Sequence, residues 1–199
     1  MKDERELVAQ AQHGSDEAFT ELVEAYQTHV YNLCYRMLGE AQSAEDAAQE
    51  TFLRAFQHLQ RYDHTRPFGT WLLSIAAHYC IDRLRRRRFS FTSFDEDEDG
   101  HALELPDPAA PSPELETVHR EQREQMHGYL QRLNSIDRAA IVLRYWHDCS
   151  EAEIAATLNL TVSAVKSRLH RARRELGDLW QEEGKRTNRA RRPHESPAF

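Results

Sequence analysis

A run of acidic residues followed by prolines divides this sequence into two parts. Asp95–Asp99 are five consecutive acidic residues, and four prolines fall between Pro106 and Pro113. Proline breaks a helix, and a polar stretch of this kind buries little apolar surface, so no continuous helix or core can run through it. The sequence therefore predicts two folded domains, a flexible acidic linker between them and a basic, disordered tail. In chain order, we expect the first domain at 1–88, the linker at 89–113, the second domain at 114–183 and the tail at 184–199.

The positions of the charged residues and the cysteines limit which classes of protein this sequence can belong to. The formal net charge is −7, but basic residues concentrate in Lys166–Arg174, so the acidic average does not exclude a nucleic-acid partner. Cys34, Cys80 and Cys149 are odd in number and isolated, which argues against a disulfide framework or a cysteine-rich zinc site. No apolar run approaches the roughly 18–20 residues that cross a bilayer, and the N-terminus lacks the apolar core of a signal peptide. We therefore expect a cytoplasmic protein with no membrane insertion.

Apolar residues recur at helical spacing in both parts, and no alternating strand pattern stands out. This periodicity predicts an all-α fold of two small helical domains. In the first domain Ser15 is the expected N-cap of a helix, and Gly39 is expected to end that helix. Ser43 and Asp46, three residues apart, resemble a capping box that opens the next helix.

The stretch that begins at Ser150 has the spacing of a helix-turn-helix. Ser150 and Glu153 form a capping box ahead of a short helix, and Ala155 is small where two helices would cross. Asn159, four residues later, tolerates the left-handed conformation of a tight turn. Thr161 is the expected N-cap of the second helix. The pattern therefore predicts two short helices in the arrangement that many DNA-binding proteins use.

The second of these helices has an apolar face and a basic face. The basic face consists of Lys166, Ser167, His170, Arg171 and Arg174. Side chains of these types can meet base edges and phosphates in the major groove. The alternative is a solvated basic helix end, in which arginines complement the C-terminal dipole. Together with the turn spacing, the pattern favours DNA recognition.

The stretch from Ala44 to Leu59 predicts a helix with one apolar face. Its expected core positions are Ala44, Ala47, Ala48, Thr51, Phe52, Ala55, Phe56 and Leu59. Leu53 lies off this face, among polar residues. A single exposed leucine is normal in a folded protein. Framed by carboxylates, an amide and an arginine, it could instead anchor a partner.

A third helix is predicted from Phe68 into the arginine run Arg85–Arg88. Most of its aromatic and apolar residues share one face, so Trp71 is expected to pack in the core. The loop before this helix mixes aromatic and basic residues and contains Pro67 and Gly69. Such a loop can accept an extruded nucleic-acid base by stacking and cationic contacts, or it can be a plain connector.

These residues resemble a known family. The stretch "AEDAAQETFLRAFQHL…PFGTWLLSIAAHYCIDRLRRRR" is similar to region 2 of the extracytoplasmic-function sigma factors, two-domain members of the bacterial sigma-70 family. The stretch "LNSIDRAAIVLRYWHDCSEAEIAATLNLTVSAVKSRLHRARREL" resembles their region 4. The two matches cover about Ser15–Arg88 and Glu121–Leu179, in the order of the family. The resemblance implies a sigma factor that binds core RNA polymerase, directs it to promoters and promotes melting.

The resemblance also implies roles for individual residues. The surface that docks on the clamp helices of the largest polymerase subunit would comprise Asp46, Gln49, Glu50, Leu53 and Arg54. The −10 element would be bound by Arg61, Tyr62, Asp63, His64, Phe68, Trp71, His78, Arg83, Arg85, Arg86, Arg87 and Arg88. The −35 element would be bound by Thr161, Ser163, Lys166, Ser167, Arg168, His170, Arg171 and Arg173.

Further partners and two departures follow from the same resemblance. Region 4 would contact the flap region of the polymerase, and the linker would thread through the active-site and RNA-exit channels, with Asp95–Asp99 on basic RNA-binding surface. Family members are commonly held inactive by an anti-sigma factor. His78 stands where many relatives carry Asn, and Asn134 replaces the usual Pro at the start of region 4.

Two other classes of protein remain open from the residues alone. An ordinary helix-turn-helix repressor or activator would use its N-terminal part for dimerisation or ligand binding, and it would bind DNA tightly without polymerase. A metal-dependent hydrolase is suggested by the 11 histidines, but these are scattered, and pairs such as His147 and Cys149 lack a third ligand. The sigma-factor interpretation requires no cofactor, no metal and no covalent chemistry by this chain.

Overall fold

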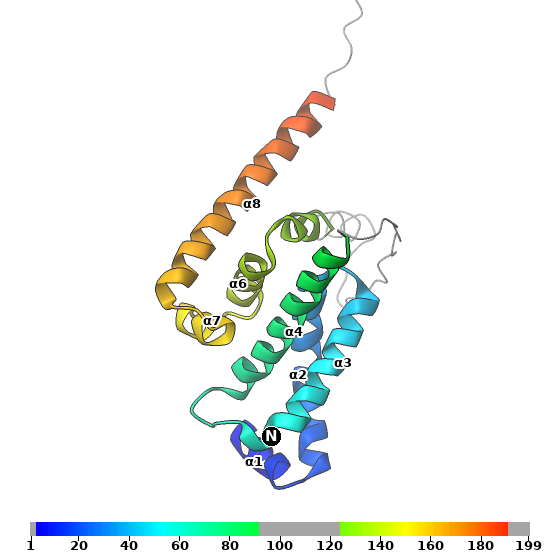
Figure 1. The fold of residues 1–199 in the computed structure, drawn as a ribbon, viewed down its shortest axis with the longest axis vertical. Coiled ribbons are helices and arrows are strands. Elements are labelled where there is room, and N and C mark those ends of the chain that lie inside the picture. The colour runs from blue at the N-terminus through cyan, green and yellow to red at the C-terminus, as the bar shows by residue number, and fades with distance from the viewer. Residues whose placement is uncertain (1–2, 92–123, 191–199) are drawn as a thin grey trace, which may run out of the picture.

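The computed structural model describes residues 3–91 and 124–190, with side chains at 3–87 and 124–183. Every regular element in these ranges is helical, which confirms the predicted all-α fold (Figure 1). The elements are α1 (Glu4–Gln12), α2 (Asp16–Leu38), α3 (Ala41–His58), the 3₁₀ turn η1 (Leu59–Arg61), α4 (Phe68–Phe91), a helical segment at 124–132, α6 (Ser135–Trp146), α7 (Glu151–Leu158) and α8 (Val162–Ala190).

The ends of α2 follow the predicted local chemistry. The Ser15 hydroxyl accepts a hydrogen bond from the Ala18 N–H at 3.2 Å, as expected of an N-cap. Gly39 ends the helix with a φ of 91°, a left-handed conformation that glycine adopts without steric cost.

The capping box predicted at Ser43 and Asp46 is wrong. Helix α3 begins three residues earlier than that box requires, at Ala41, with Glu40 as its N-cap. Ser43 therefore lies inside the helix, and its hydroxyl donates to the Glu40 carboxylate at 2.7 Å. The reason is the short connection, because only Gly39, which turns the chain, and Glu40 separate the two helices.

The first four helices pack around a core of apolar side chains. The largest fully buried members from this part include Phe68, Leu22, Leu33, Met37 and Leu72. The predicted apolar face of α3 is buried at most of its positions, but Phe56 is 51% exposed and not a core residue. Phe56 lies near the end of α3, and its ring meets that of Phe19 edge to face, with centroids 5.0 Å apart. The spacing of apolar residues along a helix does not show where the neighbouring helices end, so it could not predict that Phe56 is exposed.

The helix-turn-helix forms as predicted. Ser150 and Glu153 make a reciprocal capping box at the start of α7. Asn159 ends α7 with φ 53° and ψ 47°, and the Leu160 N–H closes the turn on the Ala155 carbonyl at 2.9 Å. The Thr161 hydroxyl accepts from the Ala164 N–H at 3.2 Å, so it caps α8.

The bounds of the described helices differ from the expected domain bounds. Helix α4 runs to Phe91, three residues into the expected linker, and α8 runs to Ala190, into the expected tail. Figure 1 shows the far end of α8 projecting away from the rest of the molecule. The acidic run Asp95–Asp99 lies outside the described residues. The division into domains, linker and tail stays a prediction.

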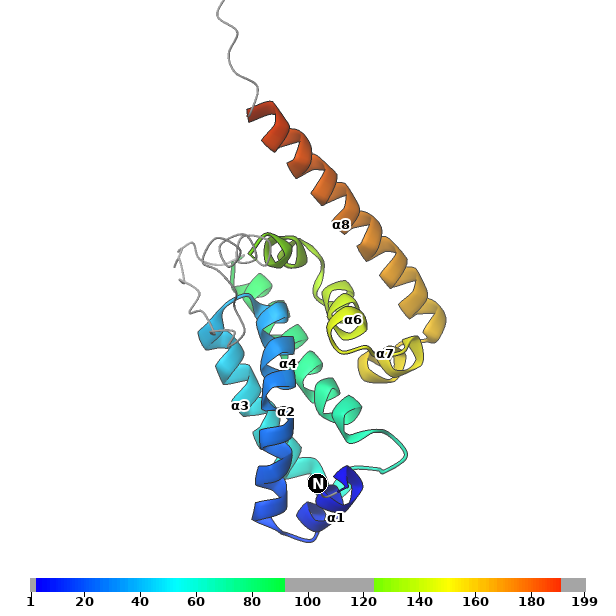
Figure 2. The ribbon, with the colours of Figure 1, turned by 180° about the vertical axis from the view of Figure 1, so that it is seen from behind.

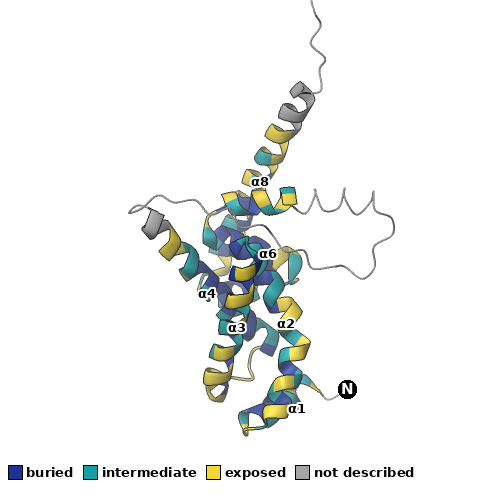
Figure 3. Cartoon of the chain, turned by 90° about the vertical axis from the view of Figure 1, so that its right-hand side faces the viewer, coloured by how far each residue is buried: buried dark blue, intermediate teal, exposed yellow. Residues whose placement is uncertain are grey.

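The two predicted domains lie directly against one another. Helix α7 packs on α4, and α6 packs on both α2 and α4 (Figure 2). Figure 3 shows buried residues gathered where α2, α3, α4 and α6 meet, and exposed residues on the outer faces and along α8. Nothing in the sequence pattern predicted this packing.

Candidate nucleic-acid and partner interfaces

One exposed face of α3 carries the residues predicted to dock on a partner. Leu53 is 52% exposed, so it contributes little to the core. Arg54 is held beside it, because its Nε donates to Glu50 Oε1 at 2.7 Å and its guanidinium lies 4.8 Å from the centre of the Tyr79 ring. The apolar anchor thus stands among side chains that are already ordered, which lowers the entropy lost on binding. Asp46 and Gln49 are exposed on the same helix.

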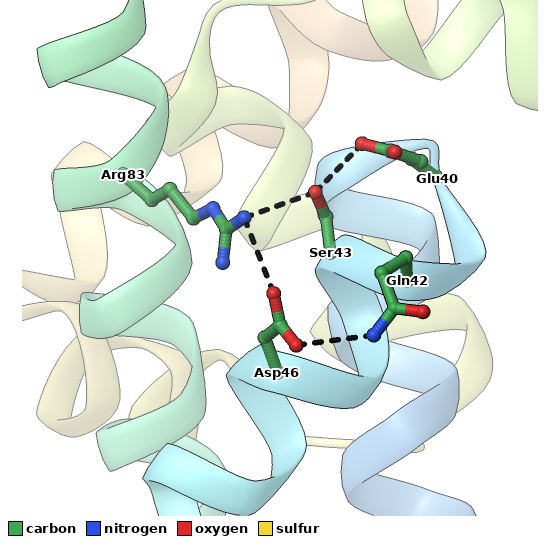
Figure 4. A network of polar contacts seen from close by, with 5 residues as sticks. All are labelled: Glu40, Gln42, Ser43, Asp46 and Arg83. Atoms are coloured by element: carbon green, nitrogen blue, oxygen red, sulfur yellow. Dashed lines mark hydrogen bonds and ion pairs between the residues drawn. The ribbon is translucent and has the colours of Figure 1, made fainter. Parts of the chain in front are cut away.

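A polar network ties this face to α4 (Figure 4). Arg83 Nη2 lies 3.6 Å from Asp46 Oδ2 and donates to the Ser43 hydroxyl at 3.1 Å. Gln42 Nε2 donates to the other Asp46 oxygen at 3.3 Å. The Arg83 and Asp46 side chains are 37% and 48% exposed, so their attraction is screened by water. Arg83, predicted to contact DNA phosphate, and Asp46, predicted to contact the partner, therefore belong to one cluster.

Two aromatic residues predicted to bind the −10 element belong to the core instead of the surface. Phe68 is 2% exposed and Tyr62 is 7% exposed. Their rings lie 5.6 Å apart, and Phe68 also meets Tyr26 at 5.5 Å. Trp71 is half-buried, 5.1 Å from the Tyr62 ring, as expected of a residue that packs. This aromatic cluster fixes the base of the loop from residue 61 to residue 67.

The rim of that loop is polar and exposed. Asp63 accepts from the Thr65 N–H at 3.0 Å and from the Thr65 hydroxyl at 2.7 Å, and these bonds lower the pKa of the Asp63 carboxyl. His64 Nε2 pairs with Gln12 Oε1 at 2.8 Å, which joins the loop to α1. Arg61 is exposed. The loop is therefore ordered by hydrogen bonds within it and to α1, and its rim is exposed.

The basic end of α4 is open to solvent. Arg85, Arg86 and Arg87 are exposed, and Arg88 belongs to the helix but its side chain lies outside the described residues. His78, about two turns before this basic end, is half-buried, and its Nδ1 lies 2.8 Å from the Ser74 carbonyl oxygen.

The outer face of α8 presents most of the residues predicted to bind the −35 element. The exposed members are Thr161, Ser163, Lys166, Ser167, His170, Arg171 and Arg173. Lys166 Nζ lies 3.6 Å from Glu151 Oε2, and Arg173 Nε donates to the Leu169 carbonyl at 3.1 Å.

Arg168 is placed differently from its neighbours on α8. Its Nη1 lies 2.6 Å from Asp137 Oδ1 on α6, and the two side chains are 25% and 6% exposed. An arginine held by a buried carboxylate fixes one helix against another, and it is a poor candidate for a mobile phosphate contact. The sequence offered no sign of this pairing, because the partners lie 31 residues apart.

Other kinds of site receive no support from the described residues. Within residues 3–87 and 124–183, no three His, Cys, Asp or Glu side chains gather where they could hold a metal ion. Cys34, Cys80 and Cys149 are buried free thiols. No helix in the described part of the chain is both long and apolar enough to cross a membrane.

Two family models match the chain. They are sigma-70 region 2, over residues 22–90, and sigma-70 region 4, over residues 123–176. The ECF RNA polymerase sigma factor SigW of Bacillus subtilis is 34% identical over 182 residues, which cover 86% of this chain and 94% of SigW. The RNA polymerase sigma-H factor of Pseudomonas aeruginosa is 33% identical over 180 residues, covering 87% of this chain and 91% of that protein.

Solved structures have the same fold. CnrH, in complex with the cytosolic domain of CnrY, matches with a TM-score of 0.68 and 28% identity over 90% of this chain and 99% of CnrH. The sigma factor RpoE from Bartonella quintana, in complex with the anti-sigma factor NepR, matches with a TM-score of 0.66 and 19% identity over 82% of this chain and 96% of that one, which shows the fold alone.

Fold and surfaces together define a helical DNA-binding protein with a helix-turn-helix in its second half. The chain belongs to the sigma-70 family, as an extracytoplasmic-function sigma factor that directs transcription initiation at promoters.

Proposed function

We propose that this chain docks on the largest subunit of core RNA polymerase through the α3 face centred on Leu53. The observation that carries the proposal is the half-exposed leucine among ordered polar side chains, Glu50 and Arg54. An apolar anchor ringed by polar groups is the usual composition of a binding hot spot. Phe56, one turn further along and equally exposed, extends the apolar patch. Region 4 contacts the flap region of the same polymerase.

The two DNA elements are read by different domains. The exposed rim of the loop at Arg61–His64, with the basic end of α4, binds the −10 element and favours its melting. Capture of an extruded base offsets an unstacking cost of about a few kcal/mol. The exposed face of α8, with Lys166 and Arg171, reads the −35 element in the major groove. Because both domains belong to one chain, the second contact is effectively intramolecular, so two weak sites give a usable joint affinity.

The buried and paired residues of the predicted DNA set have supporting roles. Phe68 and Tyr62 hold the loop in shape, and Arg168 holds α8 on α6. The residues that contact DNA are then the exposed members of the −10 set and of the −35 set. The chain acts as a dissociable specificity subunit in the cytoplasm and carries out no covalent chemistry itself.

An anti-sigma factor is a further partner. Both solved structures described above contain a second protein, the cytosolic domain of CnrY in one case and the anti-sigma factor NepR in the other. CnrH resembles this chain at 28% identity over nearly its whole length, which supports the same kind of regulation here.

Binding of labelled promoter DNA with and without core polymerase tests this function. We expect the protein alone to retain DNA weakly, and a specific complex to form only when core polymerase is added. Tight, sequence-specific binding by the protein alone, unchanged by polymerase, would instead support the repressor or activator alternative.

A further inference from the structure

An apolar side chain stands at the beginning of the helix that faces DNA. Val162 is the first residue of α8, and it is 41% exposed, whereas Val165, three residues later, is fully buried. Among residues 150–176, Val162 is the only large apolar side chain that is exposed. A single exposed valine is normal in a folded protein, so its role depends on what surrounds it.

The backbone around Val162 is fixed by the turn that precedes it. The Thr161 hydroxyl accepts from the Ala164 N–H at 3.2 Å, and the Thr161 carbonyl accepts from the Val165 N–H at 3.0 Å. Valine itself has one strongly preferred side-chain rotamer in a helix. Val162 therefore presents its two methyl groups in a defined direction, and little conformational entropy is lost when they make a contact.

Polar side chains one turn further along α8 already have partners in the protein. Lys166, which shares a side of the helix with Val162, holds its Nζ 3.6 Å from Glu151 Oε2. The Ser167 hydroxyl donates to the Ser163 carbonyl at 3.1 Å. Recognition of a base by Lys166 or Ser167 has to exchange these contacts, whereas an apolar contact by Val162 displaces only water.

A helix-turn-helix brings this end of its second helix to the bases. The N-terminal residues of the recognition helix contact base edges in the major groove. The apolar feature that distinguishes one base from the others in that groove is the C5-methyl group of thymine. An exposed and ordered valine at this position therefore matches a thymine better than any base that is recognised by hydrogen bonds.

We propose that Val162 contacts the methyl group of a thymine in the −35 element and thereby selects a T·A pair at one position. The other residues of the predicted −35 set are polar or basic, so this contact adds an apolar determinant at the beginning of α8. The inference rests on the proposed function, because it requires α8 to lie in the major groove of the −35 element.

Promoter duplexes with deoxyuridine in place of single thymines test the contact. Uracil pairs with adenine as thymine does, but it lacks the methyl group. Holoenzyme made from core polymerase and this chain is bound to duplexes of a promoter whose start site is mapped, with each thymine replaced in turn on both strands of the −35 element. We expect one replacement to weaken binding about fourfold, the affinity equivalent of burying one methylene-sized group. Replacements upstream of the element are the control and should have no effect.

The variant Val162→Ala separates a contact with the protein from an effect of the methyl group on the DNA itself. Alanine is a good helix former and leaves the Thr161 cap in place, so the helix should be retained, which circular dichroism checks. We expect Val162→Ala holoenzyme to bind the sensitive thymine duplex and its deoxyuridine counterpart equally. The matched control is Met126→Ala, at an apolar residue that is 36% exposed and lies outside α7 and α8. This control should keep the wild-type difference between the two duplexes.

The outcomes distinguish this inference from the proposed function. A promoter-specific wild-type complex that is insensitive to every deoxyuridine replacement would overturn the inference alone. The same holds if Val162→Ala keeps the wild-type difference, because the methyl group would then act through the DNA or through another residue. Wild-type holoenzyme with no preference for the promoter over unrelated DNA would overturn the proposed function and this inference with it.

Discussion

Arg168 on α8 and Asp137 on α6 form an ion pair of 2.6 Å in which the carboxylate is almost fully buried. This pair joins the DNA-reading helix to the helix behind it. Arg168 therefore supports the fold, whereas other basic residues of α8, such as Arg171, face outward. Substitutions at Arg168 and Arg171 separate these roles.

Replacing Arg168 with Ala is expected to lower stability. The buried Asp137 carboxylate would lose its cationic partner, and an unsatisfied buried acceptor costs about 1–3 kcal/mol. The free energy of unfolding, measured in urea, should fall by that amount. Arg173→Ala is the matched control, because that side chain is exposed and should change stability by about 0.5 kcal/mol or less. If the two substitutions changed the free energy of unfolding equally, Arg168 would have no special structural role.

Replacing Arg171 with Ala is expected to weaken DNA binding and leave stability unchanged. Loss of a base contact costs about 1–3 kcal/mol and relaxes specificity at one position. Transcription from promoters that vary at each −35 position should then show a reduced preference at a single position. A uniform loss at every −35 variant would make Arg171 a phosphate contact, and no loss at all would make it a solvated surface residue.

Replacing Leu53 with Asp is expected to abolish stable binding to core polymerase. An apolar hot-spot residue contributes about 2 kcal/mol or more, which corresponds to a loss of affinity of about thirtyfold or more. Tyr145→Asp is the matched control, because Tyr145 and Leu53 are both 52% exposed. Pull-down of core polymerase, with circular dichroism as a check on folding, measures the effect. Retention of polymerase by folded Leu53→Asp protein would show that this face is not the docking surface.

His147 is expected to make the stability of the protein depend on pH. Burial, with smaller contributions from His29 and Arg36, lowers the pKa of His147 to about 4, and Asp148 opposes this shift. The folded state therefore favours neutral His147, whereas the unfolded chain takes up a proton below its usual pKa of about 6.5. Stability from this residue is complete above about pH 6.5 and is lost as pH falls toward 4.

Thermal unfolding at pH 7.5 and pH 5 measures this dependence. The wild-type melting temperature should fall at pH 5, and His147→Gln, which cannot be protonated, should lose part of that fall. If the substitution leaves the difference between the two pH values unchanged, other groups account for the acid sensitivity.

Features set by local chemistry were predictable from the sequence. The caps at Ser15, Ser150 and Thr161 and the left-handed turn at Asn159 form as expected, because each depends on residues within one helical turn. The box at Ser43 failed although its pattern was suitable, since the tight turn at Gly39 had already started the helix.

Features set by distant contacts were not predictable. Phe56 has the right period for the core but is half exposed, and the pairing of Arg168 with Asp137 has no local signal. The contact between Arg138 and Met37 joins residues 101 apart across a stretch predicted to be a flexible tether. The helical period shows which face of a helix is apolar, and it carries no information on which other helix will cover that face.

The central claim is that this chain directs RNA polymerase to a promoter. Run-off transcription with purified core polymerase, on the DNA upstream of the gene for this chain, tests the claim most directly. We expect a transcript of defined length only when the protein is present, with a start site that locates both promoter elements, and no such transcript with Leu53→Asp protein. The same transcripts with and without the protein, or none under either condition while the protein alone shifts the DNA, would contradict the account.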